Sequence, residues 1–136
     1  MNMSVLLVED DQVTAHILNR LLEGVGMTVE RAGGVAEAIQ ALQAKPALIV
    51  LDLMLPDGSG VEVLQVVRSG KLACKVAVVS AASDARLLAE VTSLKPDAVF
   101  GKPLNFDDFV DWMSSIFTED PAVLTKRTQQ RDVQQA

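Results

Sequence analysis

The apolar positions of the chain follow two different periods. Four short and nearly uniform apolar runs predict strands that are buried on both faces. They occupy residues 4–8, 47–51, 76–79 and 98–100. A fifth run, at residues 27–32, is interrupted by Glu30 and Arg31, so we expect it to form a strand near an edge of the sheet.

The segments between these runs carry apolar residues at helical spacing, which predicts five helices. The helices begin near residues 12, 35, 59, 83 and 106, and their patterns end near residues 25, 42, 68, 94 and 117. The apolar stripes include Val13, Ile17, Leu18, Leu21 and Leu22 in the first helix, Val35, Ala38, Ile39 and Leu42 in the second, Leu87, Leu88, Val91 and Leu94 in the fourth, and Phe106, Phe109, Val110, Met113, Ile116 and Phe117 in the fifth. Asp11 and Asn105 are expected N-caps, and Ser59 with Glu62 forms a Ser-x-x-Glu capping box. Regular alternation of strands and helices is typical of an α/β domain with a parallel sheet.

Composition narrows the classes of function. A chain of 136 residues, 49% of them hydrophobic, predicts one domain with a sizeable core. The formal net charge of −6 argues against general binding to nucleic acid or to a membrane surface. Cys74 is the only cysteine, which excludes an internal disulfide and a metal–thiolate cluster. The first residues lack the basic segment of a signal peptide and no apolar run has membrane-spanning length, so we expect a cytoplasmic protein.

The composition changes after Phe117. Residues 118–136 are polar and rich in glutamine, and they contain little that would fill a core. We therefore expect a domain at residues 1–117, followed by a polar C-terminal tail or linker at residues 118–136. A partner-stabilised helix that starts at Asp120 and Pro121 is the alternative for this segment.

Polar side chains stand where four of the predicted strands end. Glu9 and Asp10 follow residues 4–8, Asp52 follows residues 47–51, Ser80 follows residues 76–79, and Lys102 comes just after residues 98–100. In a doubly wound sheet, ligands bind outside the carboxyl ends of the strands. We therefore expect these five side chains to form one site.

The charges of such a site indicate its chemistry. Carboxylates that are packed together repel one another, so they need protons or a cation between them. Hard oxygen ligands at an open site suit Mg²⁺, which keeps several waters and accepts phosphate oxygens. An aspartate can act as a nucleophile toward phosphorus and form an aspartyl phosphate. The metal and Lys102 would supply the positive charge that an incoming phosphoryl group requires.

Four motifs resemble the receiver domain of bacterial two-component response regulators. They are Leu7-Val8-Glu9-Asp10-Asp11, Leu51-Asp52-Leu53-Met54-Leu55-Pro56-Asp57-Gly58, Ser80-Ala81 and Lys102-Pro103. The resemblance covers residues 4–117 and implies a flavodoxin-like fold, with five parallel strands and helices on both faces. It also implies a phosphorylation-dependent signalling switch rather than an enzyme with an external substrate.

The resemblance assigns a role to each acidic residue. Asp52 would accept a phosphoryl group from a histidine kinase or a phosphotransfer protein. Glu9 and Asp10 would form an acidic pair at the metal, and Asp10 and Asp52 would bind Mg²⁺ together with the backbone carbonyl group of Met54. Asp11 is expected to act only as a helix cap.

The resemblance also concerns the residues around the phosphate. Ser80 and Lys102 would contact the phosphoryl group, and the Lys102–Pro103 peptide would be cis. The chain departs from the family at Val99, because a Tyr or Phe is common three residues before the lysine. Phe100 should point to the other side of its strand and belong to the core. The aromatic half of the usual switch is therefore absent.

Partners and rival functions complete the prediction. A downstream output protein or output domain would read a surface on the fourth helix, the last strand and the fifth helix, which would also serve a homodimer. A receiver-like adaptor that takes no phosphate is one alternative, and Val99 favours it. An aspartyl-phosphate phosphatase is less favoured, since such enzymes carry Asp-x-Asp where this chain has Asp52-Leu53-Met54. A flavin carrier would need a phosphate-binding loop after the first strand, where this chain has acids.

Overall fold

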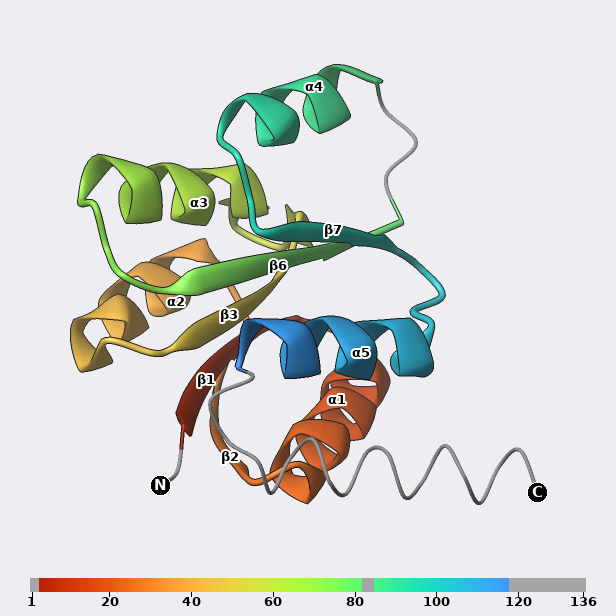
Figure 1. Cartoon of the computed structure of the whole chain (residues 1–136). Coiled ribbons are helices and arrows are strands. Elements are labelled where there is room, and N and C mark those ends of the chain that lie inside the picture. The colour runs from red at the N-terminus through yellow and green to blue at the C-terminus, as the bar shows by residue number, and fades with distance from the viewer. Residues whose placement is uncertain (1–2, 82–84, 118–136) are drawn as a thin grey trace. The chain divides into compact units, whose positions relative to one another are not determined.

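A five-stranded parallel sheet organises the structure, a computed structural model that describes residues 3–81 and 85–117. Its strands are β1 (Met3–Val8), β2 (Met27–Ala32), β3 (Leu48–Asp52), β6 (Lys75–Ser80) and β7 (Ala98–Gly101). They lie in the order β2-β1-β3-β6-β7, and all neighbouring pairs are parallel (Figure 1). This is the order of the flavodoxin-like doubly wound fold, so the predicted fold class is confirmed.

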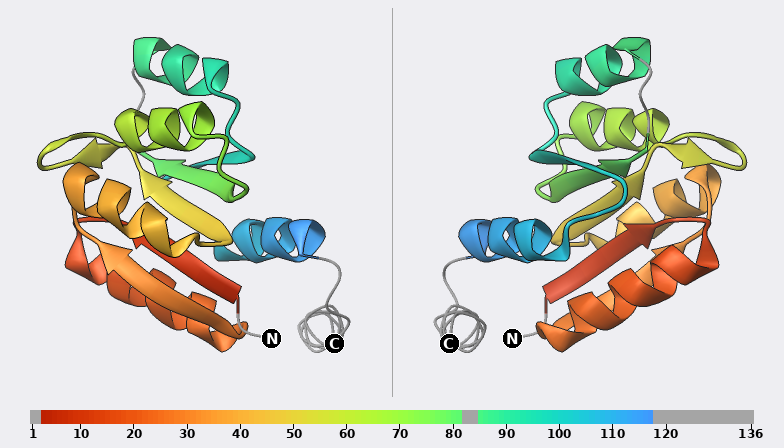
Figure 2. Two further views of the ribbon diagram at one scale, coloured as in Figure 1. Left: turned by 90° about the vertical axis from the view of Figure 1, so that its left-hand side faces the viewer. Right: turned by 90° about the vertical axis from the view of Figure 1, so that its right-hand side faces the viewer.

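The described residues form five α-helices. They are α1 (Gln12–Gly24), α2 (Val35–Ala41, continued by a 3₁₀ turn at Leu42–Ala44), α3 (Gly60–Ser69), α4 (Ala85–Ser93) and α5 (Phe106–Ile116). The chain forms two compact units, Met1–Pro103 and Leu104–Ala136, and α5 is the described part of the second. Within the first unit, α1 covers one face of the sheet and α2 and α3 cover the other (Figures 1 and 2).

Two of the predicted features lie outside the described residues. These are the start of the fourth helix at Ser83 or Asp84 and the tail at residues 118–136. Among the helices at residues 3–81 and 85–117, none combines the length and the hydrophobicity needed to cross a membrane.

The hydrophobic core explains why the central strands are apolar on both sides. All five residues of β3 are buried, because β3 lies between β1 and β6 and is covered on both faces. Alternate strand residues contribute to a core shared with α2, α3 and α4. This core includes Leu6, Val8, Ile49, Leu51, Val76 and Val78 from the strands, and Val35, Ala38, Val61, Leu64, Val67 and Val91 from the helices.

The apolar stripe of α1 is narrower than the sequence suggested. Leu18 and Leu22 are buried as predicted, together with Ala15. Val13 and Ile17, which belong to the predicted apolar stripe, are however 68% and 45% exposed. The contacts of α1 with the sheet involve mainly β2, the edge strand, and only a narrow face of the helix is covered there.

The predictions near β7 also needed correction. Only Val91 of α4 is fully buried; Leu87 and Leu94 are partly buried and Leu88 is 37% exposed. Phe100 is partly buried rather than a core residue, because β7 is an edge strand with a single neighbour. In α5, Phe109 and Met113 are buried, whereas Phe106 is 41% exposed.

Side-chain caps define where the helices begin. The Asp11 carboxylate accepts a hydrogen bond from the Thr14 N–H at the start of α1. The predicted capping box of α3 is present, with Ser59 and Glu62 satisfying each other's backbone groups. Asn105 caps α5 by accepting the Asp108 N–H. These local signals were readable from the sequence because each cap lies next to its own helix.

The cap of α2 comes from a distant part of the chain. After β3, a short hairpin is formed by β4 (Met54–Leu55) and β5 (Gly58–Ser59). Asp57, in the turn of this hairpin, accepts hydrogen bonds from the N–H groups of Val35 and Ala36 at 2.6 and 3.1 Å. These bonds lower the pKa of the Asp57 carboxyl, because they stabilise its ionised form.

The corrected stripe of α1 predicts a contrast between two neighbouring residues. Leu18→Ala should lower the free energy of unfolding by about 2–5 kcal/mol, because it removes a buried side chain and leaves a cavity. Ile17→Ala should cost less than about 1 kcal/mol, because Ile17 is largely exposed. Urea unfolding followed by circular dichroism measures both values. Equal losses in the two variants would contradict the assignment of the buried face.

The capping role of Asp57 predicts a pH-dependent stability. A carboxyl group with a lowered pKa stabilises the folded state above its ordinary pKa of 3.8, and this stabilisation is lost as the pH falls through the lowered value. Wild-type protein should therefore be more stable than Asp57→Ala at neutral pH, and the difference should shrink as the pH falls below 3.8. Urea unfolding across this range measures the difference. A difference that is independent of pH would contradict the ionised cap.

Candidate functional site

The carboxyl ends of β1 and β3 lie side by side where the chain changes direction across the sheet. From β1 the chain continues to β2 at one edge, and from β3 it continues to β6 and β7 on the other side. Glu9 and Asp10 directly follow β1, and Asp52 is the last residue of β3. Ligands of doubly wound folds bind at this switch in strand order.

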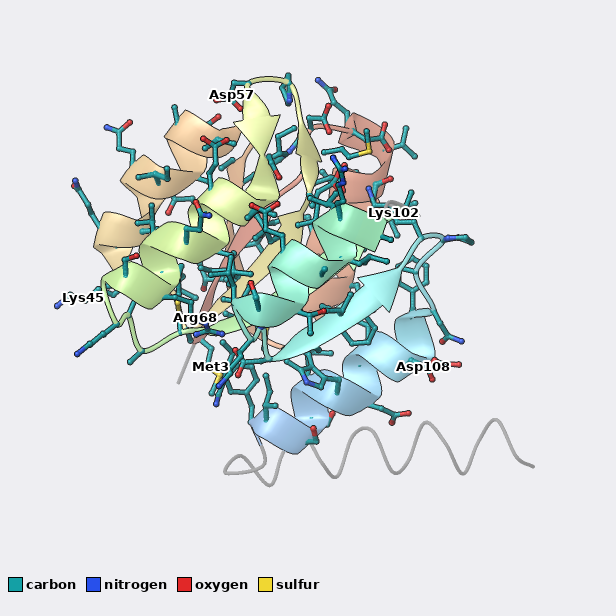
Figure 3. The ribbon with its side chains drawn as sticks, turned by 90° about the horizontal axis from the view of Figure 1, so that it is seen from above. Met3, Lys45, Asp57, Arg68, Lys102 and Asp108 are labelled. Carbon is teal, nitrogen blue, oxygen red and sulfur yellow. The ribbon has the colours of Figure 1, made fainter. Side chains whose placement is uncertain are left out.

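Lys102 connects the two carboxylates that are buried here. Its ammonium Nζ lies 2.9 Å from Oε2 of Glu9 and 3.1 Å from Oδ2 of Asp52. The lysine follows β7 and approaches the site from the far side of β6; it is labelled in Figure 3. Burial alone would lower the pKa of Lys102, but the two carboxylates outweigh it and raise this pKa. The ammonium group is therefore held in its charged form.

Glu9 is almost completely buried, with 2% of its surface exposed. Its Oε1 accepts a hydrogen bond from the backbone N–H of Asp11, while its Oε2 accepts one from Lys102. Burial raises the pKa of the Glu9 carboxyl, and the negative charge of Asp52 adds to this effect. The positive charge of Lys102 therefore does not fully offset the cost of burying the ionised Glu9 carboxylate. A further cation nearby would stabilise this ionised form.

Asp52 is also buried, and its two oxygens have different neighbours. Oδ1 accepts a hydrogen bond from the Met54 N–H at 3.1 Å, and Oδ2 faces Lys102. Gly60, at the start of α3, donates its N–H to the Leu53 carbonyl. A Cβ at Gly60 would clash with the Asp52 carbonyl oxygen, so only glycine allows α3 to begin this close to the site.

Asp10 is exposed and completes the acidic cluster. Carboxylate oxygens of Glu9, Asp10 and Asp52 all lie within 4.8 Å of one another. Two opposite ligands of an octahedral Mg²⁺ are separated by roughly 4.2 Å, so a small adjustment would let the cluster hold one such ion. With Lys102, three ionised carboxylates and one ammonium group leave a formal charge of −2. The donor set and its charge therefore fit a divalent cation that prefers oxygen ligands.

Ser80 and the Lys102–Pro103 peptide lie at the neighbouring strand ends. Ser80 is the last residue of β6 and is buried, and its carbonyl oxygen accepts the Lys102 N–H at 3.0 Å. The Lys102–Pro103 peptide is cis, as predicted. Of the predicted site residues, the structure brings Glu9, Asp10, Asp52 and Lys102 into one cluster and places Ser80 at the same edge of the sheet.

Sequence reasoning missed two residues that support the site. Arg31, at the edge of the sheet, directs its guanidinium group at the backbone carbonyls of Glu9 and Asp10, at 3.3–3.5 Å. Asp57 belongs to the predicted motif that follows Asp52, but its capping of α2 was not predicted. The position of Arg31 near the carboxyl end of a strand was the one feature that pointed to a role at the site. The contacts of Arg31 with the Glu9 carbonyl and of Asp57 with α2 cannot be seen in the local sequence.

Val99 occupies the position where the family often has an aromatic residue, and it is 49% exposed. Phe100, the next residue, lies on the other side of the edge strand β7. No rearrangement of an aromatic ring at position 99 is therefore available to this chain.

Comparison with known proteins identifies the family. The response regulator receiver domain model matches residues 5–114. Similar curated proteins include the KDP operon transcriptional regulatory protein KdpE of Escherichia coli, which is 43% identical over 82 residues and is matched over 60% of this chain and 36% of its own length. The cyclic di-GMP phosphodiesterase of Thermotoga maritima is 30% identical over 105 residues, which is 77% of this chain and 28% of that protein. The chain thus spans about a third of the length of these relatives.

Solved structures agree on the fold. The signal receiver domain of a LuxO repressor protein from Vibrio parahaemolyticus is 26% identical, with a TM-score of 0.75 over 100% of this chain and 99% of the other. A CheY-like receiver domain protein from Methanospirillum hungatei has a TM-score of 0.81 over 88% of this chain and 96% of its own, at 23% identity. The chain therefore belongs to the receiver domains of response regulators, the signalling domains of two-component systems.

Proposed function

We propose that this chain is a phosphorylation-dependent switch, in which Asp52 accepts a phosphoryl group from a histidine kinase or a phosphotransfer protein. The observation that carries the proposal is the position of the Lys102 ammonium group, within 3.1 Å of both Glu9 and Asp52. A lysine held beside an aspartate at the edge of an acidic cluster can stabilise the negative charge of an arriving phosphoryl group. Family membership supports the same conclusion.

The transfer needs no general acid from this chain. A carboxylate oxygen of Asp52 attacks phosphorus, the new P–O bond forms, and the P–N bond of the phosphohistidine breaks. The imidazole leaves with the bonding electron pair and takes up a proton from water. Lys102 then moves its hydrogen bond from the Asp52 carboxylate to an oxygen of the phosphoryl group, and the buried Ser80 at the end of the neighbouring strand donates a second one.

Mg²⁺ would be held by Asp10 and Asp52, with Glu9 beside them. The family resemblance adds the Met54 carbonyl as a further ligand. When bound, the ion neutralises phosphate oxygens during transfer. The residues of the chain keep the site preorganised: Glu9 and Asp52 fix Lys102, and the Met54 N–H orients the acceptor carboxylate.

We also propose limits for the domain and a partner for its output. Residues 1–117 form the receiver domain and residues 118–136 a polar tail or linker. The phosphoryl group adds roughly −1.5 to −2 charge, which shifts the equilibrium between two surface conformations. A downstream output protein or domain reads this change, and the chain itself has no external substrate. The cytoplasmic location and the homodimer stay predictions.

A receiver-like adaptor that works without phosphate is the second candidate function. The exposed Val99 favours it, because the aromatic residue of the usual switch is missing. In that case the acidic cluster would no longer take a phosphoryl group, and the surface of the protein would not respond to a phosphoryl donor.

Labelling with a small phosphoryl donor separates the two candidates. With acetyl phosphate and Mg²⁺, wild-type protein should gain the mass of one phosphoryl group by intact mass spectrometry, and Asp52→Asn should gain none, because the amide is not a nucleophile. Asp108→Asn, on an exposed residue of α5, is the matched control and should label like wild type. Labelling of Asp52→Asn at the wild-type rate would remove the assignment, and an unlabelled wild type would favour the adaptor.

The role of Lys102 predicts a defect in rate rather than in folding or metal binding. Lys102→Gln should label about a hundredfold more slowly, because the charge that stabilises the transferred group is lost. Mg²⁺ should still bind to this variant by isothermal titration calorimetry, because the carboxylates remain. Lys75→Gln removes an exposed lysine that pairs with Asp97 and serves as the control. If Lys102→Gln and Lys75→Gln label equally fast, the ammonium group takes no part in the transfer.

A further inference from the structure

The Asp57 carboxylate connects the loop that follows Asp52 to the start of α2. It accepts the Val35 and Ala36 N–H groups at 2.6 and 3.1 Å, across 22 and 21 positions of sequence. The residue in the local N-cap position of α2 is Gly34, which has no side chain to satisfy these groups. Figure 3 shows Asp57 at the tip of the hairpin, above the helix that it caps.

Gly34 makes room for this contact. Its φ of −162° is extended backbone that any residue adopts, so the conformation does not require glycine. A Cβ at this position, however, would lie 2.7 Å from Oδ1 of Asp57. A residue with a side chain would therefore push the Asp57 carboxylate away from α2. Glycine at position 34 thus removes the local cap of α2 and also leaves the space in which the Asp57 carboxylate caps the helix.

The other end of the hairpin reaches the acceptor residue. Met54, the first residue of β4, donates its N–H to Oδ1 of Asp52, and its own pairing partner in the hairpin is Ser59. Next to Asp57, Gly58 has a φ of +154°, and a Cβ there would clash with a carboxylate oxygen of Glu62. The hairpin is thus held at its base by the α3 capping box and at its tip by Asp57.

We propose that Asp57 is a positioning residue, which clamps the β4–β5 hairpin to α2 and thereby fixes the Met54 backbone and the Asp52 carboxylate for Mg²⁺. This inference rests on the proposed function of the site. Without the clamp, the hairpin keeps its base but its tip is released. The Met54 carbonyl and the Asp52 oxygens then sample orientations that do not bind the ion together, and the affinity for Mg²⁺ falls.

The competing explanation is that Asp57 is only a helix cap, which stabilises α2 and has no effect on the metal site. The two roles can be separated because α2 can be given a local cap. In Asp57→Ala the space beside Gly34 is free, and a serine at position 34 has the backbone conformation and the hydroxyl group of an N-cap. The double variant Gly34→Ser/Asp57→Ala therefore restores the cap of α2 without restoring the clamp on the hairpin.

The experiment measures stability and Mg²⁺ affinity in wild type, Asp57→Ala and the double variant. Urea unfolding gives the stability, and isothermal titration calorimetry with MgCl₂ gives the dissociation constant without any phosphoryl donor. The double variant should recover most of the stability lost in Asp57→Ala, yet bind Mg²⁺ about tenfold more weakly than wild type, as is typical when a residue that orients a metal ligand is removed. Asp57→Asn keeps one acceptor oxygen and should give an intermediate affinity, which provides the test if Asp57→Ala does not fold.

The outcomes distinguish this inference from the function on which it rests. Wild-type affinity in both the double variant and Asp57→Asn would show that Asp57 is only a cap, and would overturn the clamp while leaving the proposed function intact. A wild-type protein that binds no Mg²⁺ would overturn both.

Discussion

The contact between one lysine and two buried carboxylates determines how the rest of the site is arranged. Glu9 and Asp52 lie at the ends of adjacent strands, where their like charges would repel if nothing lay between them. Lys102 offsets one of these charges but not both, and the exposed Asp10 adds a third. The site therefore keeps a net negative charge that a divalent cation can neutralise. In the proposed function, the same ammonium group moves its hydrogen bond from Asp52 to a phosphoryl oxygen.

The fold keeps these groups in place through contacts that reach across the chain. The buried strands β1 and β3 fix the two acids, since neither strand can slide without exposing its apolar residues. The loops that follow β1 and β3 are bonded to other segments: Arg31 donates hydrogen bonds to the carbonyl groups that follow β1, and Asp57 in the hairpin after β3 accepts the Val35 N–H. Arg31 belongs to β2, and Asp57 binds the start of α2, which follows β2 in the chain. The loops that follow β1 and β3 are thus both bonded to one short stretch of chain, from β2 to the start of α2.

The sequence predicted the sheet and the cluster, because the apolar runs are local signals and the predicted parallel sheet brings their ends together. Apolar runs that end in Glu9, Asp52 or Lys102 identify the strands, and parallel strands bring such ends to one edge. The periodicity of α1 did not predict that Val13 and Ile17 are exposed, since the spacing of apolar residues does not say how wide a face the sheet will cover. Asp57 and Arg31 were missed for a related reason. Their partners are more than 20 residues away, and only the folded topology brings them together.

We propose that Glu9, Asp10 and Asp52, at the ends of β1 and β3, surround one divalent cation, with the Lys102 ammonium group paired to Glu9 and Asp52 beside it. The most direct test of this proposal is a crystal structure of the protein grown with Mn²⁺, whose anomalous scattering locates the ion and which prefers the same oxygen ligands as Mg²⁺. The account predicts one ion bound directly to Asp10 and Asp52, at about 2.1–2.2 Å, with Lys102 still beside Glu9 or Asp52. An ion bound elsewhere, or no ion at a saturating concentration of Mn²⁺, would contradict it.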